Sequence, residues 1–434
     1  MRLHILASAV FFGLGAATLA VSAKGDDGSR EETFRQLDLF ADVLTRIESD
    51  YVTDPDKAEL IESAIDGMLQ ALDPHSSYLS PDDFQDMQVS TRGEYGGVGI
   101  EVTIRDDMIT IISPIADTPG ERAGLEPGDR IIAVDGESML GADMNEAVDR
   151  MRGPAGEPVE LTIAREGSDP FDVSVVRDII EVRAASWRME ENDTPYLRIT
   201  TFNEQTTENV VAGIRDLTEA YGGPLPGLVL DMRSNPGGLL DQSVSVSGLF
   251  LDGGEVVSTR GRDPRDTLRY NADPGDMLNG APIVVLINQG SASASEIVTG
   301  ALKDRERATI LGLTSFGKGS MQTVIPLRGG RDGALRLTTA RYYTPAGVSI
   351  QATGITPDIA VAARRIDTDA PSRFSEADLR NALGNETGEE RADIDAEIVE
   401  QPPEDWAEDE DYQLSRAIEV LQTMMASDQA ALEQ

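Results

Sequence analysis

Two short apolar runs limit most strongly how this chain can fold. Residues 227–232 read GLVLDM and residues 283–287 read IVVLI, and each run precedes a glycine-containing loop and a stretch with helix-like spacing. Such runs are typical of strands that are buried on both faces and alternate with helices in α/β units. We therefore predict an α/β core over residues 168–360, with its chemistry where strand ends meet helix starts.

The two loops that follow these strands carry the candidate chemistry. One is Arg233-Ser234-Asn235-Pro236-Gly237-Gly238, and the other runs from Asn288 to Glu296 and is rich in serine. Ser293-Ala294-Ser295-Glu296 fits a capping box, in which serine only caps the helix, and Ser291 or Ser295 could do similar work. A nucleophile would differ by being accessible at the strand-to-helix turn, beside free N–H donors. Both interpretations stay open on this pattern alone.

Histidine and cysteine are nearly absent, which narrows the catalytic chemistry. The chain has no cysteine and only two histidines, His4 and His75. A Ser–His–Asp triad would have to recruit His75 from a proline-containing turn, and zinc sites usually need several His or Cys ligands. The scarcity of these residues therefore disfavours a zinc site, and we expect no cofactor.

Lysine usage points to a different base. Only four of the 37 basic residues are lysines, namely Lys24, Lys57, Lys303 and Lys318. Lys318 alone lies between two glycines, after an apolar stretch. A buried lysine with a lowered pKa can take the proton of a serine hydroxyl. The alternatives are an exposed turn or a phosphate-binding loop, and the latter lacks the expected G-x-x-x-x-G-K-[ST] spacing.

Residues 93–167 read as a compact module of short strands. The strings GGVGIEV and AGLEPGDRIIAVDG resemble a PDZ domain. The resemblance implies that Gly97, Val98, Gly99 and Ile100 form a carboxylate-binding loop, while the adjoining strand edge accepts a peptide as an added strand. The alternative is that these glycines merely shape the start of a strand.

The N-terminal sequence suggests export. Arg2 and His4 precede an apolar run over residues 5–21 and a small-residue site, so residues 1–23 are predicted to be a signal peptide or an uncleaved membrane anchor. The protein would then work in the periplasm, or be anchored at the inner membrane. Residues 30–92 have helical periodicity and suit packing or dimerisation.

The strongly negative charge of the chain bears on its partners and on the nature of its C-terminal segment. The net charge of −40 argues against nucleic acid, because phosphate binding needs clustered Lys and Arg. Residues 361–434 are strongly acidic and are expected to be a solvated, partly disordered extension with a short helix near 412–425. No role is inferred for this extension.

Five motifs together are similar to one known family. GSASASE at residues 290–296 and FGKGSMQ at residues 316–322 resemble the C-terminal processing peptidases, or tail-specific peptidases. LDPHSSYLSP, DMRSNPGGLL and LTTARYYTPAG match in the family's order, so the resemblance covers about residues 35–360. It implies a core of the crotonase/Clp-protease kind with an inserted PDZ domain. It also implies cleavage of proteins near flexible, apolar C-termini without ATP or metal.

The resemblance also assigns roles to single residues. It implies that Ser293 is the nucleophile, Lys318 the general base and Gln322 the group that orients the lysine amine. The oxyanion hole would fall on the backbone N–H groups of Gly238 and Ala294.

Two further positions match the family. Asp304 matches an aspartate implicated in some members, although it could equally be a helix-end partner of Arg305 or Arg307. Arg152 matches a PDZ arginine that couples peptide binding to activity.

Partners and rival functions complete the expectations. The family suggests periplasmic protein substrates, including cell-wall hydrolases or their regulators, self-assembly through terminal helices, and an adaptor protein. A peptide-binding protein with an inert core is one rival, and another acyl-transfer or crotonase-like enzyme is the second. The PDZ module and Lys318 argue against the second rival.

Overall fold

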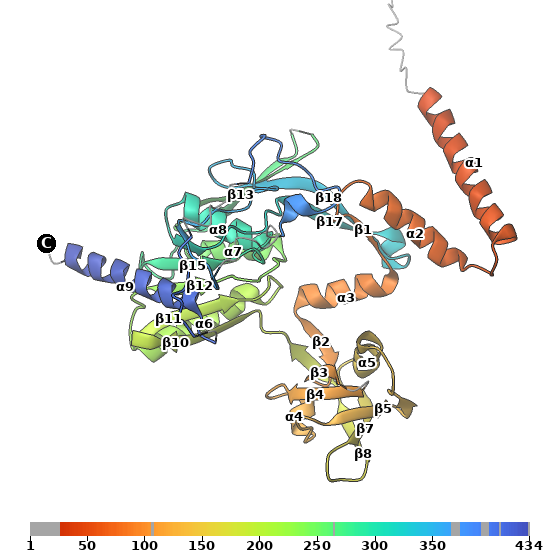
Figure 1. Ribbon diagram of the computed structural model, residues 1–434, viewed down its shortest axis with the longest axis horizontal. Helices are drawn as coiled ribbons and strands as arrows, with labels where there is room; N and C mark the ends of the chain where they lie inside the picture. The colour runs from red at the N-terminus through yellow and green to blue at the C-terminus, as the bar shows by residue number, and fades with distance from the viewer. Residues whose placement is uncertain are drawn as a thin grey trace, which may run out of the picture. The chain divides into compact units, whose positions relative to one another are not determined.

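The structure is a computed structural model that describes residues 27–105, 108–263, 265–365, 374–391, 399–407 and 409–432 (Figure 1). The chain divides into two units, residues 1–64 and 65–434. The first unit contains α1 (Asp27–Asp50) and the start of α2 (Lys57–Gln70), so its described part is helical. The predicted signal peptide lies outside the described residues. No helix in the described ranges has the length and apolar character needed to cross a membrane.

A six-stranded sheet forms the centre of the core. Its order is β10-β11-β12-β15-β16-β19, and every pairing except β10 with β11 is parallel. The strand bounds are β10 (Ala185–Glu190), β11 (Thr194–Ile199), β12 (Leu228–Asp231), β15 (Ile283–Ile287), β16 (Thr309–Gly312) and β19 (Ile359–Ala360). All residues of β12 and β15 are buried, as the two apolar runs predicted.

Helices cover both faces of this sheet. On one face, a cluster of buried apolar residues joins alternate strand residues such as Leu228 and Ile283 to α6 (Thr206–Tyr221), α7 (Leu240–Gly248) and α8 (Ala294–Asp304). Because successive strand residues point to opposite faces, the intervening residues form a second cluster on the other side.

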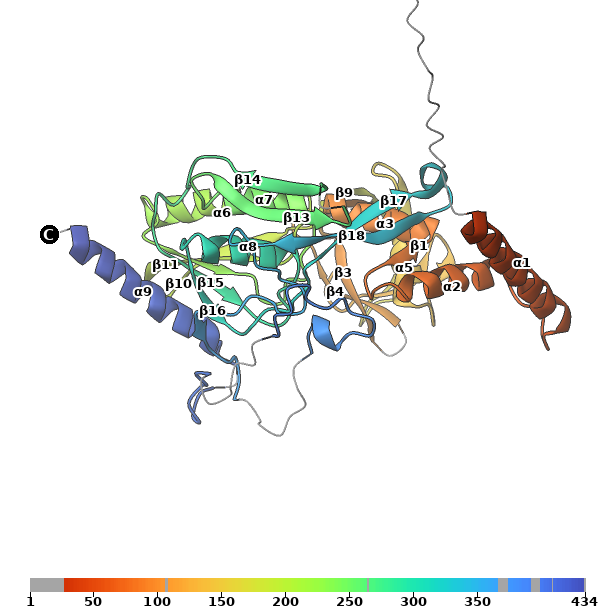
Figure 2. The same cartoon turned by 90° about the horizontal axis from the view of Figure 1, so that it is seen from above.

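The second face is covered by the C-terminal helix. In α9 (Tyr412–Leu432), Leu414, Ala417 and Leu421 are buried in the same cluster as Val229 and Val284, and α9 packs along β15, β12 and β16 (Figure 2). The prediction of a solvated tail is therefore wrong for this helix, because its apolar stripe covers a face that a parallel sheet must bury.

A second sheet connects distant parts of the sequence. Its order is β1-β18-β13-β14, with β17 also pairing with β18. The bounds are β1 (Ser77–Leu79), β13 (Gly254–Gly261), β14 (Thr267–Ala272), β17 (Ser320–Pro326) and β18 (Ala334–Tyr343). β1 pairs antiparallel with β18, with Ser77 opposite Arg336. This pairing brings the early LDPHSSYLSP motif to β18, which is the partner of β17, the strand that follows Lys318.

The PDZ-like module has a separate core. Its sheet has the order β3-β4-β5-β7-β8, β6 pairs with β5, and α4 and α5 complete it. The bounds are β3 (Ile100–Arg105), β4 (Met108–Pro114), α4 (Pro119–Arg122), β5 (Arg130–Val134), β6 (Glu137–Ser138), α5 (Met144–Met151), β7 (Pro158–Ala164) and β8 (Phe171–Val176). β8 pairs with β7, so the module extends past the predicted boundary at residue 167.

The module is joined to the core by paired segments. α3 (Pro81–Arg92) begins at the capping box of Ser80 with Asp83 and ends at Gly93. β2 (Glu94–Gly97) then pairs with the returning strand β9 (Asp178–Glu181). The short 3₁₀ turns are η1 (Glu191–Asp193), η2 (Leu327–Gly330) and η3 (Glu376–Asp378).

Candidate active site

Ser293 lies at the junction of a buried strand and a helix. It is the N-cap of α8, at φ 55° and ψ −112°, and 8% of it is exposed. A non-glycine residue at positive φ is strained and persists only where its surroundings hold it. The other two serines of this serine loop (288–296) are anchored, because Ser291 Oγ donates to Met232 O and Ser295 Oγ donates to Asn235 O. The hydroxyls of Ser291 and Ser295 are thus engaged by backbone carbonyls, and Ser293 is the candidate nucleophile among the three serines.

The loop after β12 packs directly on the serine loop. In this glycine loop (233–238), Asn235 O accepts the N–H of Ala292 at 3.0 Å. Gly237 has φ 100°, and a Cβ there would lie 2.8 Å from Ser293 Cβ and 2.9 Å from Ala294 N. Only glycine fits this approach without displacing the backbone of the serine loop.

The two predicted oxyanion donors belong to these loops. Ala294 is the first residue of α8, where an N–H has no partner within its own helix. The short parallel bridge between Phe202 and Gly238 uses the carbonyl of Gly237 and the N–H of Leu239, so the Gly238 N–H is not one of its donors. That these two N–H groups together form an oxyanion hole stays a prediction.

Lys318 is half-buried in the lysine loop (314–319), between β16 and β17. Its amine forms no hydrogen bond to another residue in the described ranges. Burial, followed by the positive charge of Arg336, holds the pKa of Lys318 below its usual range, while Glu376, Glu296 and Asp73 oppose that shift. A lysine with a lowered pKa can act as a base near neutral pH.

Glu296 links the two loops. Its carboxylate accepts the backbone N–H of Ser293 at 2.8 Å and that of Lys318 at 2.9 Å. It also accepts from Gly317 N at 2.7 Å and Ser315 Oγ at 2.6 Å. The side chain is fully buried, and burial raises the pKa of Glu296 to about 7. The sequence signalled Glu296 only as a helix-capping residue, so its second set of donors was missed.

Gln322 is near the lysine loop but turned to other partners. Its Nε2 donates to Ser320 Oγ and Thr338 Oγ1, both at 3.1 Å. Thr338 Oγ1 donates in turn to the buried carboxylate of Asp73 at 3.0 Å. The bond between Gln322 and the Lys318 amine that the resemblance implies is not formed among the described residues.

Asp304 lies at the opposite end of α8 from Ser293, roughly 16 Å along an 11-residue helix. Its carboxylate accepts the N–H of Ala346 at 2.9 Å. Arg305 and Arg307 instead donate to the carbonyls of Gly253 and Phe250. The structure therefore brings Asp304 neither to the Ser293–Lys318 region nor to the arginines proposed as its partners.

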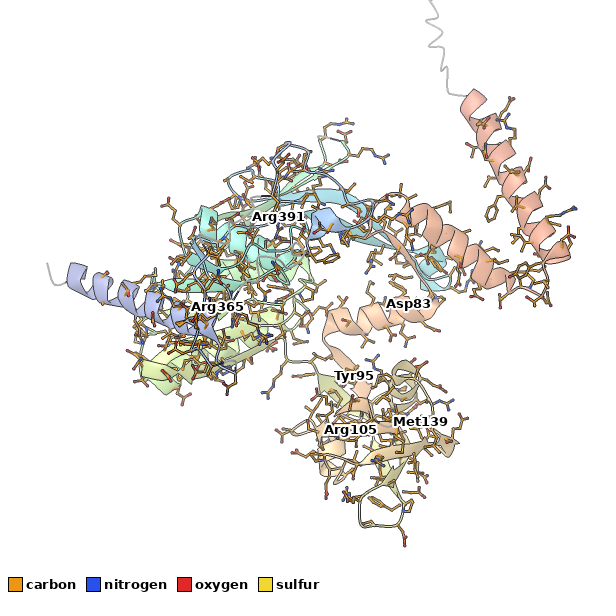
Figure 3. All side chains as sticks on the ribbon, in the orientation of Figure 1. Asp83, Tyr95, Arg105, Met139, Arg365 and Arg391 are labelled. Atoms are coloured by element: carbon orange, nitrogen blue, oxygen red, sulfur yellow. The ribbon has the colours of Figure 1, made fainter. Side chains whose placement is uncertain are left out.

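The predicted PDZ residues come together around one pocket of about 160 Å³, which we call the PDZ groove. Its lining is Tyr95, Gly97, Val98, Gly99, Ile100, Val102, Val148, Met151 and Arg152. Arg152 lies 3.2 Å from Asp86 of α3, and its guanidinium lies over the ring of Tyr95 (labelled in Figure 3). Gly99 has φ 76°, and its carbonyl accepts from Thr118 Oγ1 and Ile115 N.

Two further features were not foreseen. His75 Nε2 lies 2.8 Å from Glu376 Oε2, so the buried Glu376 is its partner. Arg391 donates to Ser315 O and Phe316 O of the lysine loop. No cluster of three or more His, Asp or Glu side chains in the described part of the chain is arranged to hold a metal ion.

Comparisons with known proteins agree with this architecture. The family profile "Peptidase family S41" matches residues 193–361, "PDZ domain" matches residues 110–165, and "Activating protease CtpB N-terminal domain" matches residues 13–82. A carboxy-terminal-processing protease of Bartonella bacilliformis is 48% identical over 425 residues, covering 95% of each chain. The carboxy-terminal processing protease CtpA of Bacillus subtilis is 35% identical over 322 residues, covering 72% of this chain and 66% of that one.

A solved structure, the photosystem II D1 C-terminal processing protease, is 30% identical and covers 76% of this chain and 94% of its own, with a TM-score of 0.43. The family profile and the PDZ profile confirm the predicted α/β peptidase core with an inserted PDZ domain. The chain therefore belongs to peptidase family S41, among the PDZ-containing, serine-type carboxy-terminal-processing proteases.

Proposed function

We propose that this chain is an endopeptidase that captures the C-terminal end of periplasmic proteins in its PDZ groove and cleaves them with Ser293 and Lys318. The reaction passes through an acyl-enzyme and needs neither ATP nor a metal. One observation carries the proposal: the carboxylate of Glu296 ties the backbone of the strained Ser293 to that of Lys318, whose pKa is lowered.

The mechanism follows from these groups. The neutral amine of Lys318 takes the Oγ proton of Ser293 while the oxygen attacks the scissile carbonyl. The N–H groups of Gly238 and Ala294 stabilise the oxyanion, a contribution of roughly 3–4 kcal/mol for a single donor in comparable hydrolases. Collapse breaks the peptide bond, and the leaving amine takes the proton from Lys318. The Lys318 amine then takes a proton from water as the water oxygen attacks the ester, and it returns that proton to Ser293 Oγ when the C–O bond breaks and the acid product leaves.

The side-chain arrangement in the structure is consistent with the enzyme before substrate binds. The Lys318 amine is unpaired among the described residues, and Gln322 donates to Ser320 and Thr338. Catalytic hydrogen bonds often tighten only when substrate binds. We infer that substrate binding brings the amine to Ser293 Oγ and turns Gln322 toward it.

Substrate capture is assigned to the PDZ groove. β3 pairs on one side only, with β4, in the described sheet, so its other edge can accept an extended peptide. The backbone of residues 97–100 would hold the terminal carboxylate. Arg152 lines the groove and also contacts Asp86 of α3, which supports a role in coupling capture to the core.

Location and assembly are part of the proposal. The N-terminal sequence supports export to the periplasm, with inner-membrane attachment if residues 1–23 are retained. α1 leaves Phe34 65% exposed and Leu37 57% exposed, and its unburied apolar side chains support self-association through this helix. An adaptor protein would deliver substrates to the PDZ groove.

The test uses an unstructured peptide with an apolar C-terminus and mass spectrometry of its products. The full chain should release C-terminal fragments, while Ser293→Ala should bind the peptide and leave it intact. Captured but uncleaved peptide with the folded native chain would favour a binding protein. Wild-type cleavage that persists in Ser293→Ala would remove Ser293 from the mechanism.

A further inference from the structure

A segment outside the family-matched residues packs on the lysine loop. We call residues 374–391 the C-terminal strap. The backbone N–H of Glu376 donates to Phe316 O at 3.1 Å, and the rings of Phe374 and Phe316 lie 6.1 Å apart between centroids. Phe316 is two residues before Lys318. The strap therefore forms part of the support of the candidate base.

Arg391 fixes the same loop from the other end of the strap. Its guanidinium (labelled in Figure 3) donates to the carbonyls of Ser315 at 2.8 Å, Phe316 at 3.2 Å and Thr314 at 3.3 Å. A guanidinium presents its donors in a fixed fork, so one side chain can hold successive carbonyls of a loop. The peptide groups preceding Lys318 are thus held in one conformation.

The carboxylate of Glu376 is held by residues from two other parts of the chain. His75 Nε2 lies 2.8 Å from Oε2, and Gln351 Nε2 donates to Oε1 at 3.0 Å. Gln351 Oε1 accepts the N–H of Gly319, the residue after Lys318, at 3.0 Å. A charge with no exposed surface is costly unless it is paired or hydrogen-bonded, which explains this set of partners.

Glu376 also acts on the Lys318 amine through charge. Among the carboxylates around Lys318, Glu376 contributes most to raising its pKa, ahead of Glu296 and Asp73. The mechanism proposed above gives Glu376 no part. We propose that Glu376 is a positioning residue of the active site, which fixes the lysine loop and supplies negative charge beside the Lys318 amine, and that His75 and Gln351 hold it there.

This inference rests on the proposed role of Lys318 as the base. The charged or titratable groups around the pair are His75, Asp73, Asp378 and Arg391 near Glu376, and Arg336, Asp73 and Glu296 near Lys318. When the Glu376 charge is removed, less remains to oppose the lowering of the Lys318 pKa by burial and by Arg336. The pKa of Lys318 should then fall further, because its ammonium form loses a stabilising anion.

The experiment compares Glu376→Gln with Glu389→Gln, a control at an exposed position of the same strap. In full-chain enzyme, kcat for the apolar-tailed peptide should fall on the order of tenfold in Glu376→Gln, since small displacements of catalytic groups cost that much or more. KM should be unchanged, and the midpoint of the kcat/KM profile should move to lower pH. A purely structural loss would lower kcat without moving the midpoint.

A second readout does not depend on turnover. With only four lysines in the chain, ¹³C-labelled lysine signals of Ser293→Ala protein can be followed by NMR, and Lys318→Arg identifies the Lys318 signal. Adding Glu376→Gln should move its titration to lower pH, whereas Glu389→Gln should leave it in place. An unmoved Lys318 titration would overturn the inference even if the peptidase is active.

Should Glu376→Gln fail to fold, Arg391→Gln tests the other end of the strap. It should lower kcat with KM kept, because the carbonyls of residues 314–316 lose the guanidinium that holds them together, even though Phe316 O keeps the N–H of Glu376. Wild-type kcat in Arg391→Gln would overturn the inference that the C-terminal strap positions the lysine loop. An inactive native enzyme would contradict the proposed function, but the NMR titration would still decide the role of Glu376.

Discussion

The loops that carry Ser293 and Lys318 are supported in different ways. The serine loop is held by its neighbour in the parallel sheet, because Ser291 and Ser295 bond to the backbone of Met232 and Asn235. The lysine loop shares Glu296 with the serine loop, and it is held in addition by Arg391 and by the network of Glu376 with His75. The nucleophile is thus placed by a local strand–turn–helix unit, whereas the surroundings of the base are assembled from distant parts of the chain.

The largest effect should come from exchanging the base. Lys318→Arg keeps a cation in the lysine loop but cannot accept a proton, because the arginine guanidinium does not lose its proton in proteins. We expect kcat/KM to fall by about 10⁴- to 10⁶-fold, as for loss of a catalytic group in a serine protease. Thermal unfolding should change little. Appreciable turnover by this variant would show that the lysine loop carries only structure.

The contact between the glycine loop and the serine loop can be broken by one methyl group. In Gly237→Ala the new Cβ would lie 2.8 Å from Ser293 Cβ at a φ of 100°, which displaces the nucleophile and an oxyanion donor. We expect kcat to fall by about 10²- to 10³-fold. Gly223→Ala is the matched control, because nothing lies within 4 Å of its added Cβ. Equal activity of the two variants would refute the tight packing of these loops.

Glu296 tests whether the two loops act as one unit. Glu296→Gln keeps the shape but replaces one carboxylate oxygen by an amide that cannot accept. Either the N–H groups of Ser293 and Lys318, which share Oε2, or Ser315 Oγ and the N–H of Gly317, which share Oε1, then lose their acceptor. We expect kcat to fall by roughly ten- to a hundredfold with little change in KM. Glu219→Gln, exposed on α6, is the control. Unchanged kcat in Glu296→Gln would mean that each loop holds its own geometry.

The pH profile separates the two ionisations. Lys318 is a base only when neutral, so kcat/KM should rise about tenfold per pH unit up to a midpoint below the usual lysine range. Below about pH 7, Glu296 also gains a proton and loses acceptor capacity, which steepens the acid side. Stopped or quenched peptide assays across pH measure this. A profile that is flat from acid to alkaline pH would contradict the assignment of Lys318.

The smallest effect should lie outside both loops. Amidating the C-terminus of a peptide substrate removes the carboxylate that the PDZ groove would bind, so KM should rise about tenfold, the equivalent of roughly one charge-assisted hydrogen bond. The kcat value should hold, because neither loop is touched. A peptide with an internal glutamate changed to glutamine is the control. Equal binding of amide and acid, measured calorimetrically, would exclude capture through the terminal carboxylate.

Much of the fold was predictable because its signals are local. The strands β12 and β15, their loops and the strands of the PDZ module each follow from a short stretch of sequence. The roles of Ser293, Lys318 and Gln322 stay predictions that the variants above test.

The missed residues share a physical cause. Glu376 is one acid in a strongly acidic segment, and its importance comes from His75, which is 301 residues away in sequence. No sequence pattern around either residue predicts that His75 and Glu376 pair. Asp73 was similarly hidden, because only the pairing of β1 with β18 brings it to Thr338 and Gln322.

The position of α9 has a practical consequence. A shortened protein that stops at the end of the family-matched residues would leave Val229, Val284, Leu286 and Leu311 without the helix that now lies on them. An exposed apolar surface of this kind on a β-sheet promotes association between molecules. We expect such a trimmed protein to precipitate or self-associate even with every proposed catalytic residue present, so the acidic terminus belongs in any preparation meant for assay.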